Sequence, residues 1–265
     1  MPADVGSSAV ADAIRVADLR KTFERRGAGK VIAVDGLSFS VPAGQIFGLL
    51  GPNGAGKTTT LRILTTLIRA TSGLAEVAGF DVSRDPLAVR RRVVVVVQES
   101  AAEIFLTVRD NLLTFGRFHG LSGPDLRRRA DQVMEQFGLT QDASRKAMDL
   151  SGGFRRRIQV AKALMVKTPV MFLDEFSTGM DPILKRAVME LLREEARNGR
   201  TIVLTTQILG EAEALCDDIL IINHGRQIAR GDVATVKALS ATHNASLEDV
   251  FVELMQQPAE GEASQ

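Results

Sequence analysis

Residues Gly51–Thr59, with the sequence Gly-Pro-Asn-Gly-Ala-Gly-Lys-Thr-Thr, decide the fold of this chain. They follow an apolar run of strand length, Gln45–Leu50, and precede Leu61–Ile68, whose apolar residues recur at helical spacing. A strand that turns into a helix through closely spaced glycines points successive backbone N–H groups into one concavity, with the helix dipole behind them. That concavity fits a di- or triphosphate, so the loop predicts a nucleoside triphosphate site.

Two side chains of this phosphate loop have predicted roles of their own. We expect Lys57 to reach the terminal phosphates and the Thr58 hydroxyl to join the coordination shell of Mg²⁺. The loop as a whole is expected to bind the nucleotide through Gly51, Pro52, Asn53, Gly54, Ala55, Gly56, Lys57, Thr58 and Thr59.

The composition of the 265 residues, 45% hydrophobic and 25% charged, is that of a globular protein with one sizeable core and an attached subdomain. A formal net charge of +1 provides no basic field, so no nucleic-acid partner is expected. The three arginine clusters are interpreted as solvated helix faces: Arg90–Arg92, Arg127–Arg129 and Arg155–Arg157.

Three features bear on the cellular compartment. Cys216 is the single cysteine, which excludes an internal disulfide and a zinc cluster and fits a reducing cytosol. The longest apolar run, Val93–Val97, is far shorter than the about 20 residues that a membrane span needs. Met1–Asp12 lacks the pattern of a signal peptide and is expected to be a disordered leader. Any membrane role would therefore come through a partner.

The order of predicted elements indicates an α/β fold. Strands and helices alternate as in a mostly parallel sheet with helices on both faces, and Ala13–Leu19 and Val31–Val41 predict a small antiparallel layer. A strand is also expected at Ala75–Phe80 and a helix at Gln207–Leu215. The predicted single domain, 13–257, comprises a core at 13–98 and 168–230, a helical subdomain at about 99–167, C-terminal helices at 231–257, and then a flexible tail at 258–265.

Two further motifs fit the phosphate loop. A buried strand, Val170–Leu173, ends in Asp174 and Glu175; the first is expected to hold Mg²⁺ through its waters and the second to orient the attacking water. The stretch Leu150, Ser151, Gly152 and Gly153 predicts a helix start with free N–H groups, which is a second anion site. Two phosphate-binding helix ends in one chain suggest that the second serves a neighbour's nucleotide.

Taken together, these motifs resemble the nucleotide-binding subunit of an ATP-binding-cassette (ABC) transporter, from roughly Ala13 to Met255. The resemblance implies the P-loop NTPase fold of an ABC ATPase, with ATP and Mg²⁺ as bound groups. It implies that two such subunits pair head-to-tail, as a homodimer or a pseudo-symmetric dimer. ATP then lies between the phosphate loop of one subunit and Leu150–Gly153, the signature motif, of its partner.

The resemblance also assigns roles to single residues. Gln98 corresponds to the glutamine that contacts the metal and the reacting phosphate, and Glu175 to the catalytic glutamate. Thr178–Asp181 corresponds to the D-loop at the dimer interface, with Asp181 near the nucleotide. Phe23 takes the place of the aromatic residue that stacks on adenine; a phenylalanine of the core is the alternative.

Two residues depart from the family pattern. Phe154 follows Gly153 where the family usually has Gln, and Gln207 replaces the switch histidine that contacts the γ-phosphate. Together with Arg155–Arg157 and Ser246–Phe251, they resemble the daunorubicin-resistance type of bacterial drug exporters. That resemblance implies an ATPase that powers export of a drug-like or lipid-like compound through a separate multi-helix permease. The subunit is then peripheral on the inner face of the cell membrane, with the permease's coupling helix bound near Gln98–Asn111.

Two other functions remain as alternatives. A soluble ABC ATPase of translation or DNA repair usually carries two cassettes or a long coiled coil, whereas this chain has one cassette and a short insertion. A weakly hydrolysing, ATP-gated module is the second, because Gln207 cannot change its charge as histidine does. The carboxylate of Glu175 argues against it.

Overall fold

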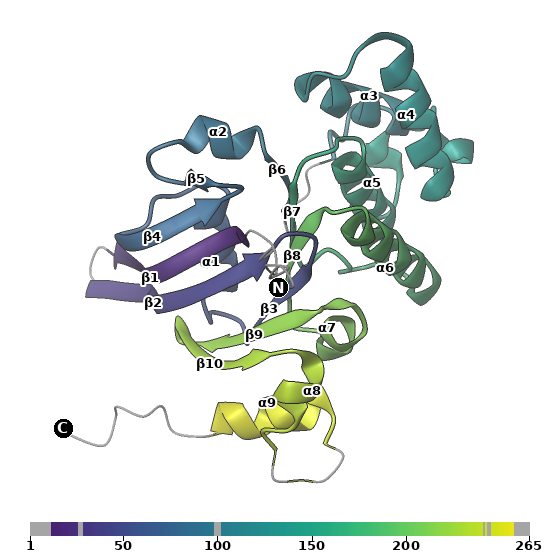
Figure 1. Cartoon of the computed structure of the whole chain (residues 1–265). Helices are drawn as coiled ribbons and strands as arrows, with labels where there is room; N and C mark the ends of the chain where they lie inside the picture. The colour runs from purple at the N-terminus through teal and green to yellow at the C-terminus, as the bar shows by residue number, and fades with distance from the viewer. Residues whose placement is uncertain (1–11, 26–28, 98–101, 241, 243–244, 257–265) are drawn as a thin grey trace, which may run out of the picture.

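The computed structural model describes residues 12–25, 29–97, 102–240, 242 and 245–256. Its centre is a six-stranded sheet in the order β10-β9-β3-β8-β7-β6, parallel except for the β9–β10 hairpin (Figure 1). The strands are β3 (Ile46–Leu50), β6 (Val93–Val96), β7 (Val170–Asp174), β8 (Thr201–Thr206), β9 (Asp218–Asn223) and β10 (Arg226–Gly231). Such a sheet places the carboxyl ends of β3, β7 and β8 at one edge.

A four-stranded antiparallel sheet lies beside the first one, in the order β2-β1-β4-β5. Its strands are β1 (Asp12–Arg25), β2 (Gly29–Pro42), β4 (Ser72–Val77) and β5 (Phe80–Asp81). Helix α1 (Lys57–Leu64) packs with both sheets, since Leu61, Val77 of β4 and Phe47 of β3 share one apolar cluster. The short helix α2 (Pro86–Arg90) leads into β6.

The opposite face of the six-stranded sheet carries the helices between β6 and β7, together with α6 (Figure 1). They are α3 (Val108–Phe118), α4 (Gly123–Gln136), the 3₁₀ turns η1 (Thr140–Asp142) and η2 (Ala147–Asp149), α5 (Gly152–Leu164) and α6 (Pro182–Arg197). One apolar cluster runs from Met171 of β7 to Val133 of α4 and Leu112 of α3. The helical segment therefore shares its core with the sheet.

The remaining helices pack beside the β9–β10 hairpin (Figure 1). They are α7 (Leu209–Leu215), α8 (Val233–Lys237) and α9 (Leu247–Gln256). Ile219 and Ile221 of β9 form their common cluster with Ala212, Val236 and Leu247. None of the helices in the described part of the chain combines the length and the hydropathy that a bilayer span requires.

The α/β fold class predicted from the sequence is confirmed, but several elements have other bounds, among them β1, which extends past the predicted Leu19 to Arg25. The helix predicted at Leu61–Ile68 is α1, which begins at Lys57 and ends at Leu64 because Thr66 takes a left-handed conformation (φ 62°). The strand predicted at Ala75–Phe80 is divided into β4 and β5 by a turn at Ala78 and Gly79, where φ is also positive.

A further difference concerns the helix predicted from Gln207. Helix α7 begins only at Leu209, because the backbone N–H of Ile208 donates to the Thr206 hydroxyl at 2.9 Å. This local bond forms a turn in place of the first helical residues. Gln207 therefore belongs to the loop that follows β8.

Candidate active site

The phosphate loop is held by close backbone contacts at two of its glycines. A Cβ atom added at Gly51 would lie 2.3 Å from the carbonyl oxygen of Ile222, and one at Gly56 (φ 107°) 2.3 Å from that of Ala33. Only glycine fits either position without displacing β9 or β2. Gly56 is also the N-cap of α1 and has no side chain to bind the first-turn amides, which leaves them for an anion.

The Lys57 side chain is buried within this loop. Its Nζ donates hydrogen bonds to the carbonyl oxygens of Gly51 at 2.7 Å and Pro52 at 2.9 Å. Burial lowers the pKa of the Lys57 ammonium, while the carboxylates of Glu175 and Asp174 act in the opposite direction. Phosphate oxygens are stronger acceptors than the two carbonyls, so the loop and its lysine fit a polyphosphate.

Asp174, the last residue of β7, brings oxygen atoms of three elements together. Its buried Oδ1 accepts hydrogen bonds from the Thr58 hydroxyl at 3.3 Å and from the Thr205 hydroxyl of β8. Thr58 and Asp174 thus present neighbouring oxygen donors beside the phosphate loop. Hydroxyl and carboxylate oxygens are ligands that Mg²⁺ prefers in phosphate sites, so the residues present fit this metal.

Glu175 follows β7 directly and has an unusual backbone. Its φ of 48° is left-handed, which costs a non-glycine residue of order 1–3 kcal/mol and persists only where the surroundings enforce it. Its N–H donates to the carbonyl oxygen of Thr205 at 3.0 Å. The site residues Lys57, Thr58, Asp174 and Glu175 are therefore gathered at one edge of the sheet.

The signature motif forms the start of α5, as its sequence predicts. The Ser151 hydroxyl accepts from the Phe154 N–H at 3.2 Å and caps the helix, and Ser151 and Gly152 are exposed. A Cβ atom added at Gly153 would lie 2.3 Å from the carbonyl oxygen of Gly179. The signature motif therefore packs directly on the D-loop, and only a glycine permits this contact.

The packing accounts for Phe154 at the position after Gly153. Phe154 packs against the apolar cluster, and the Arg157 guanidinium lies 4.7 Å from the centre of its ring. Arg157 also pairs with Asp181 at 3.7 Å, while Asp181 caps α6 by accepting from the Leu184 N–H at 2.9 Å. Phe154 thus helps to hold the signature motif and the D-loop together, and a nucleotide contact of Asp181 stays a prediction.

Phe23 lies near the phosphate loop and is not a core residue. Phe23 of β1 pairs with Val31 of β2. Val31 lies two residues before Ala33, whose carbonyl oxygen contacts Gly56. The residue is 39% exposed, and the Lys21 ammonium lies 4.8 Å from the ring centre. This position suits a ring that stacks on a base, a role that stays a prediction.

The two predicted glutamines differ in what the structure says of them. Gln98 lies outside the described residues. Gln207 is exposed in the loop after β8, immediately after Thr206, whose hydroxyl donates to Glu211 at 3.1 Å. Its predicted contact with the γ-phosphate is not tested by these observations.

Two buried charged residues that sequence reasoning did not single out connect these segments. Glu211, 2% exposed, accepts from the Ser177 hydroxyl before the D-loop, from Lys185 of α6 at 3.0 Å and from Thr206. Arg156, 7% exposed, contradicts the interpretation of the third arginine cluster as a solvated face. Arg156 lies four and seven residues before the apolar positions 160 and 163 of α5. This helical spacing is the signal that could have placed Arg156 on the buried face of the helix.

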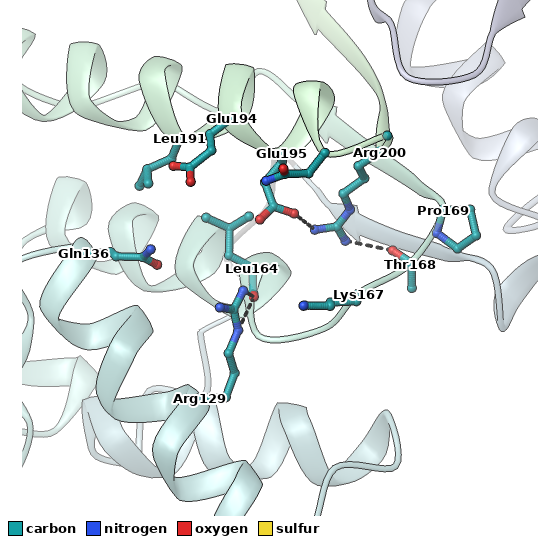
Figure 2. Close-up of a pocket in the computed structure, with 12 residues that line it drawn as sticks. Arg129, Gln136, Leu164, Lys167, Thr168, Pro169, Leu191, Glu194, Glu195 and Arg200 are labelled. Carbon is teal, nitrogen blue, oxygen red and sulfur yellow. Dashed lines mark hydrogen bonds and ion pairs between the residues drawn. The ribbon is translucent and has the colours of Figure 1, made fainter.

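A separate pocket lies away from these residues. Its volume is about 610 Å³. It lies next to Pro169 and Arg200 (Figure 2), at the amino ends of β7 and β8 and hence at the edge opposite the phosphate loop. Arg129 donates to the carbonyl oxygen of Leu164 at 3.1 Å, and Arg200 to Glu195 at 3.0 Å (Figure 2). These cations are engaged within the protein, and the pocket contains none of the predicted site residues.

Comparison with known proteins gives the family of this chain. The ABC transporter family model matches residues 34–178. The doxorubicin resistance ATP-binding protein DrrA of Mycobacterium tuberculosis (strain ATCC 25618 / H37Rv) is 44% identical over 92% of this chain and 70% of its own length. Nod factor export ATP-binding protein I of Ralstonia nicotianae is 42% identical over 86% of this chain and 68% of its own length.

A third relative, the daunorubicin/doxorubicin resistance ATP-binding protein DrrA of Streptomyces peucetius, is 44% identical over 78% of this chain but only 62% of its own length. Among solved structures, an ATP-binding subunit of an ABC transporter is 27% identical, with a TM-score of 0.83 over 92% of this chain and 100% of its own. The dimeric ATP-binding cassette MJ0796, bound to ADP and Pi, has the same fold at 24% identity. Its TM-score is 0.76 over 83% of this chain and 98% of its own. This chain belongs to the ABC transporter family and has the fold of its ATP-binding cassettes.

Proposed function

We propose that this chain is the ATP-hydrolysing subunit of an ABC exporter and acts as one half of a head-to-tail dimer on a separate membrane permease. One observation carries the proposal. The Lys57 ammonium, the Asp174 carboxylate and Glu175 meet at one edge of the sheet, beside a glycine loop built for phosphates. The relatives reported above are named for drug resistance and Nod factor export, which favours an exporter over an ATPase of translation or DNA repair.

In this proposal the phosphate loop binds the triphosphate of ATP. The first-turn amides of α1 and the Lys57 ammonium bind its β- and γ-phosphates, so the lysine exchanges two carbonyl acceptors for phosphate oxygens. Thr58 and Asp174 hold Mg²⁺, which neutralises charge on the phosphate oxygens when it is bound. Glu175 orients the attacking water and accepts its proton as the water oxygen bonds to the γ-phosphorus.

The signature motif supports pairing of two copies. Ser151 and Gly152 are exposed, the Ser151 hydroxyl caps the helix by accepting from the Phe154 N–H, and a Cβ atom added at Gly152 would meet nothing within 4 Å. The helix start is therefore open to a γ-phosphate held by another subunit. Because Gly153 packs on Gly179, the D-loop belongs to the same surface and would take part in the same interface.

The permease would bind an apolar patch formed by Ile104, Phe105 and Met148, which we call the Phe105 patch. All three side chains are exposed, Phe105 by 73%, and the Met148 N–H donates to the Ile104 carbonyl at 2.8 Å. The buried amide of Asn111 supports this loop by bonding the N–H of Glu103 at 2.8 Å. Ile104 and Phe105 lie between β6 and α3, within the segment Gln98–Asn111 predicted to receive the coupling helix, and Met148 of η2 adjoins them.

Phe105→Glu is expected to abolish binding of the permease, because it places a charge in the apolar contact. Phe118→Glu, at the other end of α3 and 85% exposed, is the matched control. The measurement is co-purification of a multi-helix membrane protein with the tagged chain from detergent-solubilised membranes. Equal recovery with Phe105→Glu and wild type, or recovery of ribosomes or DNA in place of a membrane protein, contradicts the proposal.

Gln207 is expected to support slow ATP hydrolysis without a histidine-like inflection near neutral pH, because its amide donates a hydrogen bond but carries no proton. A charged hydrogen bond contributes about 1.5–3 kcal/mol and a neutral one about 1, a difference that corresponds to roughly tenfold in rate. Gln207→Ala should be slower than wild type in steady-state ATPase assays across pH 6–9. If Gln207→Ala equals wild type in rate and in ATP affinity with the permease present, the assignment of this position is wrong.

A further inference from the structure

The guanidinium of Arg156 is bonded on every side within the protein. Nε donates to the carbonyl oxygen of Phe176 at 2.9 Å, and Nη2 to those of Asp174 at 2.6 Å and Glu175 at 2.7 Å. Nη1 donates to the carbonyl oxygen of Val97 and to Gln159 Oε1, both at 2.6 Å. These bonds use all five N–H groups that an arginine has.

Four of the five acceptors are backbone carbonyls of two segments that follow neighbouring strands of the six-stranded sheet. Asp174, Glu175 and Phe176 form the turn at the end of β7, and Val97 directly follows β6. A carbonyl that points at the guanidinium fixes the peptide plane to which it belongs. The left-handed conformation of Glu175, costly for a non-glycine residue, is therefore held from outside by one side chain of α5.

Helix α5 begins at the signature motif, and its N-cap Ser151 lies five residues before Arg156. About one and a half helical turns thus connect the helix start that would face a partner's nucleotide with the backbone of Glu175. A displacement of α5 would move the carbonyl contacts of Arg156 with it. The same arginine can therefore transmit the state of one nucleotide site to the carboxylate of the other.

We propose that Arg156 is a positioning residue for ATP hydrolysis, which holds the backbone of Glu175 in the reactive arrangement and couples it to the signature motif of the same chain. The proposal rests on the proposed function, because it assumes that Glu175 orients the attacking water. A lysine at this position keeps the charge, but its ammonium cannot span four carbonyls, since it lacks the planar fork of arginine. Geometry, and not charge alone, is therefore the property to test.

The experiment compares wild type, Arg156→Lys and the control Arg128→Lys, which alters an exposed ion pair of α4 with Asp125. The readouts are kcat at saturating ATP, the Kd for a fluorescent ATP analogue, and folding by circular dichroism. We expect Arg156→Lys to lower kcat by at least about tenfold and to change the Kd by less than about threefold. Arg128→Lys should match wild type in both. A kcat of Arg156→Lys equal to that of wild type overturns the proposal.

A double variant separates positioning from a general structural defect. If Arg156 acts through Glu175, Arg156→Lys should not reduce further the residual rate of Glu175→Gln. A structural defect would instead lower that residual rate and weaken ATP binding, which overturns the proposal. Should Arg156→Lys fail to fold, Gln159→Met removes one acceptor and leaves the four carbonyl bonds, with an expected loss of about threefold in kcat at unchanged Kd. An unchanged kcat for Gln159→Met overturns the proposal as well.

The same data distinguish failure of this inference from failure of the proposed function. Absence of ATP hydrolysis by wild type, or a Glu175→Gln variant as active as wild type, overturns the function itself. A slow Glu175→Gln variant combined with a fully active Arg156→Lys variant overturns only the role of Arg156.

Discussion

Glu175→Gln is expected to reduce ATP hydrolysis by at least about a hundredfold while ATP binding persists, because the amide keeps the size of the side chain but cannot accept the proton of the attacking water. With hydrolysis blocked, ATP should remain bound between two chains. Size-exclusion chromatography with light scattering, in the presence of ATP and Mg²⁺, should therefore show a dimer. Nucleotide-free protein is the reference state.

The matched control for this dimer is Ser151→Arg in the Glu175→Gln background. An arginine at the exposed N-cap fills the helix start that would receive the partner's γ-phosphate and also removes the cap to the Phe154 N–H. This double variant should bind ATP and stay monomeric. A Glu175→Gln chain that remains monomeric at every ATP concentration, also with the permease present, would refute head-to-tail pairing.

Lys57→Ala is expected to lower ATP hydrolysis by about 10²–10³-fold or more, since it removes a buried cation that would face the β- and γ-phosphates. The fold should persist, because the hydrogen bonds of Nζ go to two backbone carbonyls of the phosphate loop and the side chain belongs to no apolar cluster of the described residues. Phosphate release with Mg²⁺–ATP, together with thermal unfolding, measures both effects.

Lys237→Ala serves as the control for this variant, because Lys237 forms a surface ion pair with Glu213 on the C-terminal helices. It should hydrolyse ATP at the wild-type rate. Hydrolysis by Lys57→Ala near the wild-type rate would exclude the phosphate loop as the reactive site.

Local sequence was sufficient for those parts of the site whose geometry is set by neighbouring residues. The glycine spacing around Lys57 predicts the strand, loop and helix in that order, and Asp174 at the end of a buried strand is found beside Thr58 as parallel-sheet topology requires. Ser151 likewise caps the helix that its motif predicts. The positions of these residues follow once the fold is predicted correctly.

The connections among these segments could not be predicted, because they depend on which distant backbone groups meet. The spacing of Arg156 to positions 160 and 163 could indicate that it is buried, but only the packing of α5 against β7 determines which backbone carbonyls it bonds. Glu211 belongs to the same class, since its partners Ser177 and Lys185 lie 34 and 26 residues earlier in the chain. The start of α7 was misplaced for a local reason, the bond of the Ile208 N–H to Thr206.

The apolar cluster that joins β7 to α3 and α4 has a consequence for how the protein denatures. Because Met171, Val133 and Leu112 bury one another's surface, the helical segment cannot melt without exposing the sheet that carries Asp174. Heat or denaturant would then disrupt both regions in one cooperative transition. A substitution that creates a cavity in the core face of α4 would therefore lower the unfolding temperature of the enzyme as much as one in β7. Thermal tolerance of the catalytic edge is thus set partly by helices that hold none of its reacting groups.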